Sequence, residues 1–336
     1  MFFSLRIFAQ TTEIDTALAN SFSLFGPDEA LRLDLSFNYK QLIKDKYKDE
    51  YQEASLTVYL NDSTPVTETI RIKARGNFRR SYCSFPPLML NFKQADFHPK
   101  DLQDLEKLKL VTLCRNQSSY QQYIFSEYLS YKLYNILTPL SFRVRLVHIN
   151  LIDLTGKVET QAQYGFLIEE VEDVAARAAC FELKPEYVPV SQLDRQQTTL
   201  MAVFEYMIGN TDWNISNRHN VRILKPTDPN DTRIYPVPYD FDYSGLVNAY
   251  YAIPDPLLGI ESVRQRMFVL CRRQEDLFPV ITQFIEKEAE IRRVYEKFPL
   301  IDERTRREAL AYLDEFYKNI RIPSIVKQEM ADRCTK

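Results

Sequence analysis

The sequence predicts an α+β protein with two lobes, a β-rich N-terminal lobe and a mainly helical C-terminal lobe. Residues 27–98 show the period-two alternation of half-buried strands, and apolar residues at helical spacing appear from residue 118 onward. From about residue 260 the pattern is helical and ends in a surface rich in Lys and Glu. With 336 residues, 45% of them hydrophobic, the chain is long enough for two domains or one large bilobal domain.

Short strands are expected to build most of the N-terminal lobe. Alternating apolar runs, separated by turn residues such as NDSTP at 61–65, predict strands at Leu31–Phe37, Ala54–Leu60, Glu68–Gly76, Pro87–Phe92 and Leu105–Leu113. The run SSYQQYIFSEYLSYKLYNIL, Ser118–Leu137, has helical spacing and predicts the main helix of this lobe. A strand pair follows at Phe142–Asp153 and Tyr164–Val171, with a turn at Thr155 and Gly156.

The C-terminal lobe is expected to begin with a buried helix. This helix covers residues 193–208 and ends at Gly209, since glycine readily takes the left-handed conformation of a helix C-cap. Two short strands, Asn220–Leu224 and Arg233–Asp242, then surround the loop KPTDPNDT. A boundary between residues 170 and 185 gives three segments: 1–26 as signal remnant and extension, 27–172 as N-terminal lobe, and 173–336 as C-terminal lobe.

Composition argues against several functional classes. A net charge of -3 and a pI of about 5.8 disfavour nucleic-acid binding through bulk positive charge. GxGxxG and GxxxxGK[ST] are absent, which excludes two common nucleotide-binding loops. The five cysteines are scattered, so a zinc site is not expected, and their odd number neither requires nor excludes an oxidising compartment. No segment has the length and purity of a transmembrane helix.

The first residues leave the compartment open. The stretch MFFSLRIFAQ is compatible with the tail of a secretory signal that starts upstream and is cleaved before Gln10. On this interpretation the protein is exported to the periplasm or the extracellular space. Otherwise it is cytoplasmic.

Two polar segments carry the candidate chemistry. GNTDWNISNRHNVRIL begins at Gly209 and contains Asp212, and YPVPYDFDYSGL begins at Tyr235 and contains Asp240 and Asp242. Phosphoryl transfer needs one carboxylate at the acceptor hydroxyl, and amide and carboxylate oxygens that hold a divalent cation on the phosphates. A hairpin between the two segments would bring them together. Taken alone, GNTD is also an ordinary helix stop.

These segments resemble the catalytic loop and metal motif of atypical kinases, in particular the spore-coat CotH kinase family. IKARGNFRR and YGFLIEEVED, earlier in the chain, are similar to further pieces of that family in the same order. The resemblance implies a bilobal protein-kinase-like fold. It also implies transfer of the ATP γ-phosphoryl group, with Mg²⁺ or Mn²⁺, to a hydroxyl, and Ser or Thr of a protein is the expected acceptor.

The same resemblance assigns roles to individual residues. Asp212 corresponds to the catalytic aspartate and Asp240 to the metal aspartate, with Asp242 as a second ligand. The metal asparagine is Asn217 by the usual kinase spacing, or Asn220 by its position directly before the strand, and the longer loop favours Asn220.

The cation for the ATP phosphates is less clearly marked. Lys93, Lys73 and Arg75 are candidates, and Glu127 on the helix at 118–137 is the expected partner of the lysine. Glu169 and Glu170 are candidates for the border of the adenine site. His219 would orient the loop or contact phosphate, although an ordinary loop histidine has the same appearance.

Three alternatives stay open. A pseudokinase would keep the fold without catalysis, and the missing glycine loop and the unassigned lysine favour it. A secreted or cell-surface binding protein would use the loop structurally or for Ca²⁺. A small-molecule kinase would differ only in its acceptor. Neither the acceptor nor the oligomeric state follows from the sequence.

Overall fold

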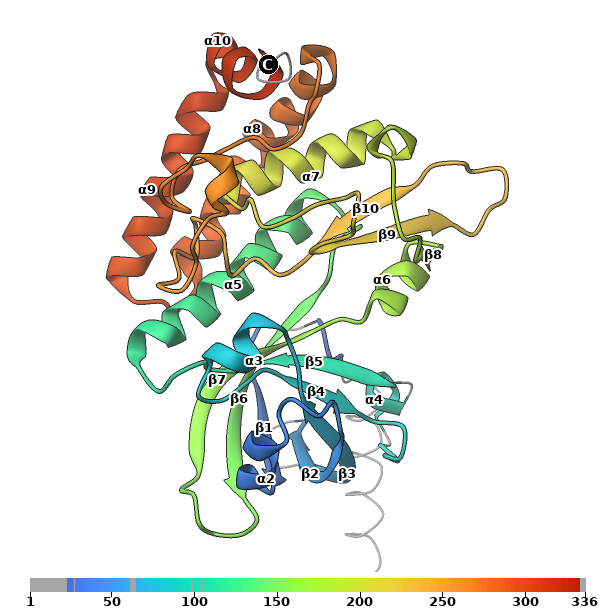
Figure 1. Cartoon of the computed structure of the whole chain (residues 1–336), viewed down its shortest axis with the longest axis vertical. Coiled ribbons are helices and arrows are strands. Elements are labelled where there is room, and N and C mark those ends of the chain that lie inside the picture. Colours follow the sequence, from blue (N-terminus) through green and yellow to red (C-terminus); the bar gives the residue numbers. More distant parts are fainter. Residues whose placement is uncertain (1–22, 27, 61–64, 98, 104, 333–336) are drawn as a thin grey trace, which may run out of the picture. The chain divides into compact units, whose positions relative to one another are not determined.

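A computed structural model describes residues 23–26, 28–60, 65–97, 99–103 and 105–332 (Figure 1). The chain divides into two compact units. Unit 1 takes Met1–Gln117 and Val144–Glu170, and unit 2 takes Ser118–Arg143 and Val171–Lys336. The expected signal remnant falls mostly in residues 1–22 and the expected turn mostly in 61–64, and both ranges lie outside the described residues.

Unit 1 is a closed barrel of seven strands in the order β1-β2-β3-β4-β5-β7-β6. Its strands are β1 (Leu31–Phe37), β2 (Gln52–Tyr59), β3 (Pro65–Ala74), β4 (Leu88–Asn91), β5 (Lys107–Val111), β6 (Val144–Asp153) and β7 (Gln161–Ile168). Short helices α2 (Tyr39–Lys44), α3 (Phe78–Tyr82) and α4 (Lys100–Gln103) lie in its connections. Every neighbouring pair is antiparallel except β1 and β6, which run parallel.

This barrel overturns the expected fold class. A bilobal protein-kinase-like fold was predicted, but the seven strands form a closed mixed barrel, which is not a kinase-like β-rich N-lobe with a helical C-lobe. The pairing of β1 with β6 closes the sheet, with Leu33 opposite Ile149. Alternation of apolar residues predicts where strands lie, but it carries no information about partners so distant in the sequence.

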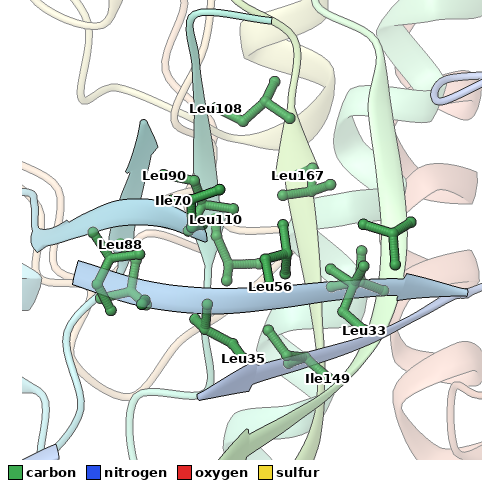
Figure 2. Close-up of a cluster of buried hydrophobic side chains, with 14 of the residues drawn as sticks. Leu33, Leu35, Leu56, Ile70, Leu88, Leu90, Leu108, Leu110, Ile149 and Leu167 are labelled. Atoms are coloured by element: carbon green, nitrogen blue, oxygen red, sulfur yellow. The ribbon is translucent and has the colours of Figure 1, made fainter. Parts of the chain in front are cut away.

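The barrel interior is a leucine-rich core. Strand β1 alternates buried and more exposed residues, so that Leu31, Leu33, Leu35 and Phe37 all face inward. Figure 2 shows that side chains from strands all around the barrel point toward one another, among them Leu33, Leu56, Ile70, Leu90, Leu110, Ile149 and Leu167. Each such side chain contributes about 1.5–3 kcal/mol through burial, so the interior accounts for most of the cohesion of unit 1.

A disulfide links two connections of unit 1. Cys83 follows α3 and Cys114 follows β5, and the sulfurs are bonded with the Cα atoms 4.6 Å apart. Ser84 N donates to Cys114 O at 3.0 Å, which holds the same two segments together through the backbone. Cys180 is free and buried, and Cys271 is free and exposed. Spacing alone could not have selected this pair from five cysteines.

Unit 2 combines helices with a three-stranded sheet. Its helices are α5 (Ser118–Leu137), α6 (Val171–Arg177), α7 (Arg195–Ile208), α8 (Gln274–Lys297), α9 (Glu303–Ile320) and α10 (Pro323–Val326). Helix α8 packs against α5, α7 and α9 (Figure 1). The sheet has the order β10-β9-β8, with β8 at Cys180–Leu183, β9 at Val221–Pro226 and β10 at Tyr235–Pro238. No described helix is both long and apolar enough to cross a membrane.

Two local expectations for unit 2 need correction, and one helix is grouped differently. Helix α5 has the predicted bounds, but it belongs to unit 2, where Phe125 contacts the ring of Phe298 at 5.4 Å. The second strand of the hairpin ends at Pro238, so Asp240 and Asp242 lie beyond the sheet. Residues 260–273 are not helical, and helix α8 begins only at Gln274. From this irregular stretch, Arg264 and Arg266 reach the ring of Tyr312 on α9.

Candidate functional site

The loop that carries Asp212 starts from a well-defined helix end. Helix α7 stops at Gly209, whose φ of 68° is the left-handed conformation that the sequence predicted. The next residue, Asn210, is buried and donates its backbone N–H to Glu205 O at 2.8 Å. Its side-chain Oδ1 accepts from Asp212 N at 3.0 Å, and its carbonyl accepts from Trp213 Nε1 at 3.2 Å. These hydrogen bonds of Asn210 hold the first residues of the loop in place. Nothing in the sequence pattern had marked Asn210 for this part.

The carboxylate of Asp212 is held from two sides. His219 Nε2 lies 2.9 Å from Asp212 Oδ1, and Asn220 Nδ2 donates to Asp212 Oδ2 at 3.1 Å and to Asp212 O at 2.7 Å. The side chain of Asp212 is nevertheless 40% exposed. It is thus an oriented carboxylate that a second molecule can reach.

The β9–β10 hairpin (Figure 1, yellow-orange) joins the two polar segments, as the sequence analysis expected. Val221 pairs with Pro238 at the end of the ladder, and Tyr239 N donates to Asn220 O at 3.0 Å just beyond it. Asn220 takes a φ of 52°, which turns the loop into the strand. Asn220 and Asp240 are consequently brought to the same end of one hairpin.

The Asp240–Asp242 segment is anchored through its central phenylalanine. Phe241 is fully buried, and its ring lies 4.6 Å from Tyr131 on α5 and 5.4 Å from Phe204 on α7. Asp240 N donates to Tyr131 Oη at 2.8 Å. Asp240 has a φ of 70°, a conformation that is uncommon outside glycine and concentrates at functional sites.

Three carboxylates converge in unit 2. Glu127, Asp240 and Asp242 each offer an oxygen, and these atoms all lie within 4.8 Å of one another. Glu127 is only 1% exposed and Asp242 5%. Carboxylate oxygens are hard donors of the kind that divalent cations such as Mg²⁺ and Mn²⁺ prefer. The residues present therefore fit a divalent cation.

Glu127 is the residue whose placement differs most from expectation. From the sequence, Glu127 was expected to pair with a phosphate-binding lysine. In the structure it lies one turn before Tyr131 on α5 and joins the two aspartates. The helical pattern marked Glu127 only as a polar residue among apolar neighbours, and the contact with Asp240 and Asp242 depends on tertiary packing.

The two candidate asparagines differ in what their side chains already do. Asn217 is exposed, and its Oδ1 accepts from His219 N at 3.0 Å. Asn220 is nearly buried and uses Nδ2 toward Asp212, so Oδ1 is the atom it can offer to a metal. This difference supports Asn220 as the metal asparagine, as the sequence analysis favoured.

The candidate cations lie in unit 1. Lys73 forms an ion pair with Asp49 at 2.6 Å, and its ammonium stands over the ring of Tyr51. Lys93 is exposed and lies 3.3 Å from Glu106. Among the described residues, Arg75 makes no ion pair, and its backbone N–H donates to Pro87 O at 2.8 Å. Of the three candidates, Arg75 is therefore the one whose side chain forms no ion pair with another described residue.

The two glutamates proposed for the adenine border also lie in unit 1, at the end of β7. Glu169 is fully buried. Glu170 lies 3.5 Å from Lys109, and both side chains are largely buried. Lys109 did not feature in the sequence analysis, because a single lysine in a strand pattern is indistinguishable from a solvated one.

A buried glutamate, Glu205, underlies the loop. Burial raises the pKa of Glu205 well above its usual range, the neighbouring Asn210 side chain opposes this, and the charge of Asp212 adds to it. Burial therefore favours the protonated form of the Glu205 carboxyl beneath the loop.

Gly209 and Gly245 join the Asp212 loop to the Asp240–Asp242 segment. Gly245 N donates to Gly209 O at 3.0 Å, and Leu246 N donates to Ile208 O at 2.9 Å. A Cβ on Gly209 would lie 2.0 Å from Tyr312 Oη, and one on Gly245 would lie 2.5 Å from it. The ring of Tyr312 is held between Arg264 and Arg266, so it has little room to move.

Neither a protein-family model nor a curated protein matches this chain. The chemistry of the site therefore has to be inferred from its own residues. Unit 2 holds an oriented, accessible carboxylate at Asp212 and a cluster of three carboxylates, two of them buried, and the β9–β10 hairpin joins the Asp212 loop to the two aspartates of that cluster.

Proposed function

We propose that this protein is a phosphotransferase that uses Mg²⁺ or Mn²⁺ to move the γ-phosphoryl group of ATP to a hydroxyl. Ser or Thr of a protein is the expected acceptor. One observation carries the proposal: unit 2 holds the accessible carboxylate of Asp212, and it holds the cluster of Glu127, Asp240 and Asp242, of which Glu127 and Asp242 are buried. Phosphoryl transfer requires these two kinds of carboxylate.

Asp212 has the properties needed at the acceptor. An ionised carboxylate accepts hydrogen bonds only, and each of its oxygens has two acceptor positions. His219 and Asn220 use one position on each oxygen, which leaves the others for the acceptor hydroxyl. Asp212 would orient this hydroxyl and take its proton as the bond to phosphorus forms.

The three-carboxylate cluster has the properties needed at the metal. Glu127, Asp240 and Asp242 are hard-oxygen donors, and Asn220 Oδ1 is a neutral fourth donor at the adjoining end of the loop. A bound divalent cation would neutralise the charge that develops on the phosphate oxygens. Burial of Glu127 and Asp242 keeps water away and strengthens their pull on a cation.

The cation for the ATP phosphates stays a prediction, with Lys93, Lys73 and Arg75 as its candidates. Lys73 pairs with Asp49 and Lys93 lies 3.3 Å from Glu106, so each of these two ammonium groups already faces a carboxylate. Membership of the CotH family stays a prediction, as does the border of the adenine site at Glu169.

Export is proposed as the location. The Cys83–Cys114 disulfide supports it, since such bonds persist mainly in oxidising compartments. Thiol labelling of the protein taken directly from its native cells tests this, because Cys83 and Cys114 should react only after a reductant is added. Labelling of both cysteines without reductant would contradict export.

The decisive experiment is transfer of labelled phosphate from ATP to a mixture of protein and small hydroxyl acceptors, with Mg²⁺, with Mn²⁺ and with chelator. Asp212→Asn and Asp240→Asn should each lower transfer by at least about 100-fold. Ser216→Ala, in the same loop, should keep wild-type activity. Binding of ATP without turnover would indicate a pseudokinase, and no binding at all would reject the proposal.

A further inference from the structure

His219 contacts the carboxylate of Asp212 from within the same loop, but it has no role in the proposed function so far. Its Nε2 lies 2.9 Å from Asp212 Oδ1. Because an ionised carboxylate only accepts, this bond requires the proton on Nε2. The contact spans seven positions of the loop, so it depends on how the loop folds back on itself.

The backbone of the loop places His219 independently of its imidazole. Asn214 and His219 form an isolated antiparallel bridge, in which each N–H donates to the carbonyl of the other at 2.9 Å. Asn217 Oδ1 also accepts from His219 N at 3.0 Å. Arg218, the residue before it, has a φ of 59° and completes the turn. Removal of the ring therefore leaves these backbone contacts in place.

Packing does not explain the ring either. The side chain of His219 is 53% exposed, so its loss opens no cavity. Asn220 restrains Asp212 Oδ2, and His219 restrains Asp212 Oδ1. Without His219, one oxygen is released, and a carboxylate that is partly exposed can rotate about its terminal torsion.

We propose that His219 is a positioning residue, which holds the Asp212 carboxylate in the plane that the acceptor hydroxyl needs. The inference rests on the proposed phosphotransferase function. It replaces the other role considered for this residue, a direct contact to phosphate. Loss of a catalytic carboxylate's alignment lowers turnover without changing how ATP binds.

The test compares His219→Ala, His219→Gln and Ser216→Ala in steady-state transfer assays on the full chain. We expect His219→Ala to lower kcat by about 10- to 100-fold and to leave KM for ATP within about twofold. His219→Gln should recover most of the loss, because its side-chain amide can donate a similar bond. Ser216→Ala is the matched loop control and should match wild type. All melting temperatures should agree within about 2 °C.

The outcomes separate this inference from the function on which it rests. If Asp212→Asn abolishes transfer while His219→Ala keeps the wild-type kcat, the positioning role is wrong and the phosphotransferase stands. A rise in KM for ATP at constant kcat would make His219 a nucleotide contact and would also overturn the inference. If His219→Gln is as impaired as His219→Ala, a donated hydrogen bond is not the cause. Absence of transfer by the wild-type chain overturns both proposals.

Discussion

The contact between Gly209 and Tyr312 yields a quantitative prediction about how the site is held together. Substitution of Gly209 by Ala places a Cβ 2.0 Å from Tyr312 Oη at a φ of 68°. The left-handed conformation alone costs about 1–2 kcal/mol for a residue with a Cβ. Overpacking adds about 1–3 kcal/mol, because Arg264 and Arg266 hold the tyrosine ring on both faces. We therefore expect a total loss of about 2–5 kcal/mol in the free energy of unfolding.

Gly259→Ala is the matched control within the same unit. Gly259 has a φ of 67°, and an added Cβ meets no atom within 4 Å. It should cost only the conformational share, about 1–2 kcal/mol. Tyr312→Phe on its own should be neutral or stabilising, because the buried Tyr312 hydroxyl has no hydrogen-bond partner among the described residues. In the Gly209→Ala background it should restore part of the loss, since Tyr312 Cζ remains 3.1 Å from the new Cβ.

Urea unfolding followed by tryptophan fluorescence measures these differences. The chain has a single tryptophan, Trp213, which is buried in the Asp212 loop next to the affected helix end. The double substitution should show a coupling of about 1 kcal/mol or more between positions 209 and 312. Equal losses for Gly209→Ala and Gly259→Ala, or strict additivity with Tyr312→Phe, would refute the reasoning.

Three further predictions concern stability and its pH dependence. Replacement of Cys83 and Cys114 by Ser should lower the free energy of unfolding in urea by about 3–4 kcal/mol, because the unfolded chain would no longer be closed into a loop by a bond between residues 31 positions apart. No change would mean that the disulfide is absent in solution. Hydrogen bonds from the Thr155 hydroxyl and from backbone N–H groups lower the pKa of Asp153, so the ionised carboxylate stabilises the fold above pH 4 and this stabilisation fades as the pH falls further. Asp153→Asn should remove this contribution to the pH dependence of the free energy of unfolding, measured from pH 6 to 3. Burial raises the pKa of Glu205, so stability should fall as the pH rises above the usual titration range of a glutamate, and Glu205→Gln should flatten this dependence at little cost; an unchanged slope would place the ionisable group elsewhere.

Local sequence patterns predicted where the helices and strands of this protein lie better than they predicted which elements pair or pack with one another. Apolar spacing placed α5 at Ser118–Leu137 and located the barrel strands to within a few residues. The parallel pairing of β1 with β6, which closes the barrel, left no trace in either strand alone. The fold class was wrong for this reason, because strand closure is a non-local property.

For the candidate site, too, nearby segments were predicted from the sequence and contacts between distant segments were not. The Asp212 loop and the Asp240–Asp242 segment are joined by a short hairpin, and residue types with turn signals were sufficient to mark both. Glu127 comes from a helix far earlier in the chain, and only the packing of Tyr131 against Phe241 brings it to the aspartates. The hydrogen bond of His219 depends on a loop that folds back on itself, which composition does not reveal.

The central claim is that Glu127, Asp240 and Asp242 hold a divalent cation on a nucleotide. Its most direct test is the thermal stability of the full chain with Mn²⁺, with ATP and with both. The account predicts that both together, at about 100 times Kd, add about 2.7 kcal/mol and raise the melting temperature of a unit of this size by about 5–10 °C. Glu127→Gln and Asp240→Asn should abolish this rise, and Glu261→Gln, an exposed acid outside the cluster, should keep it. A rise that ATP produces without metal, or one that survives in both cluster variants, would contradict the account.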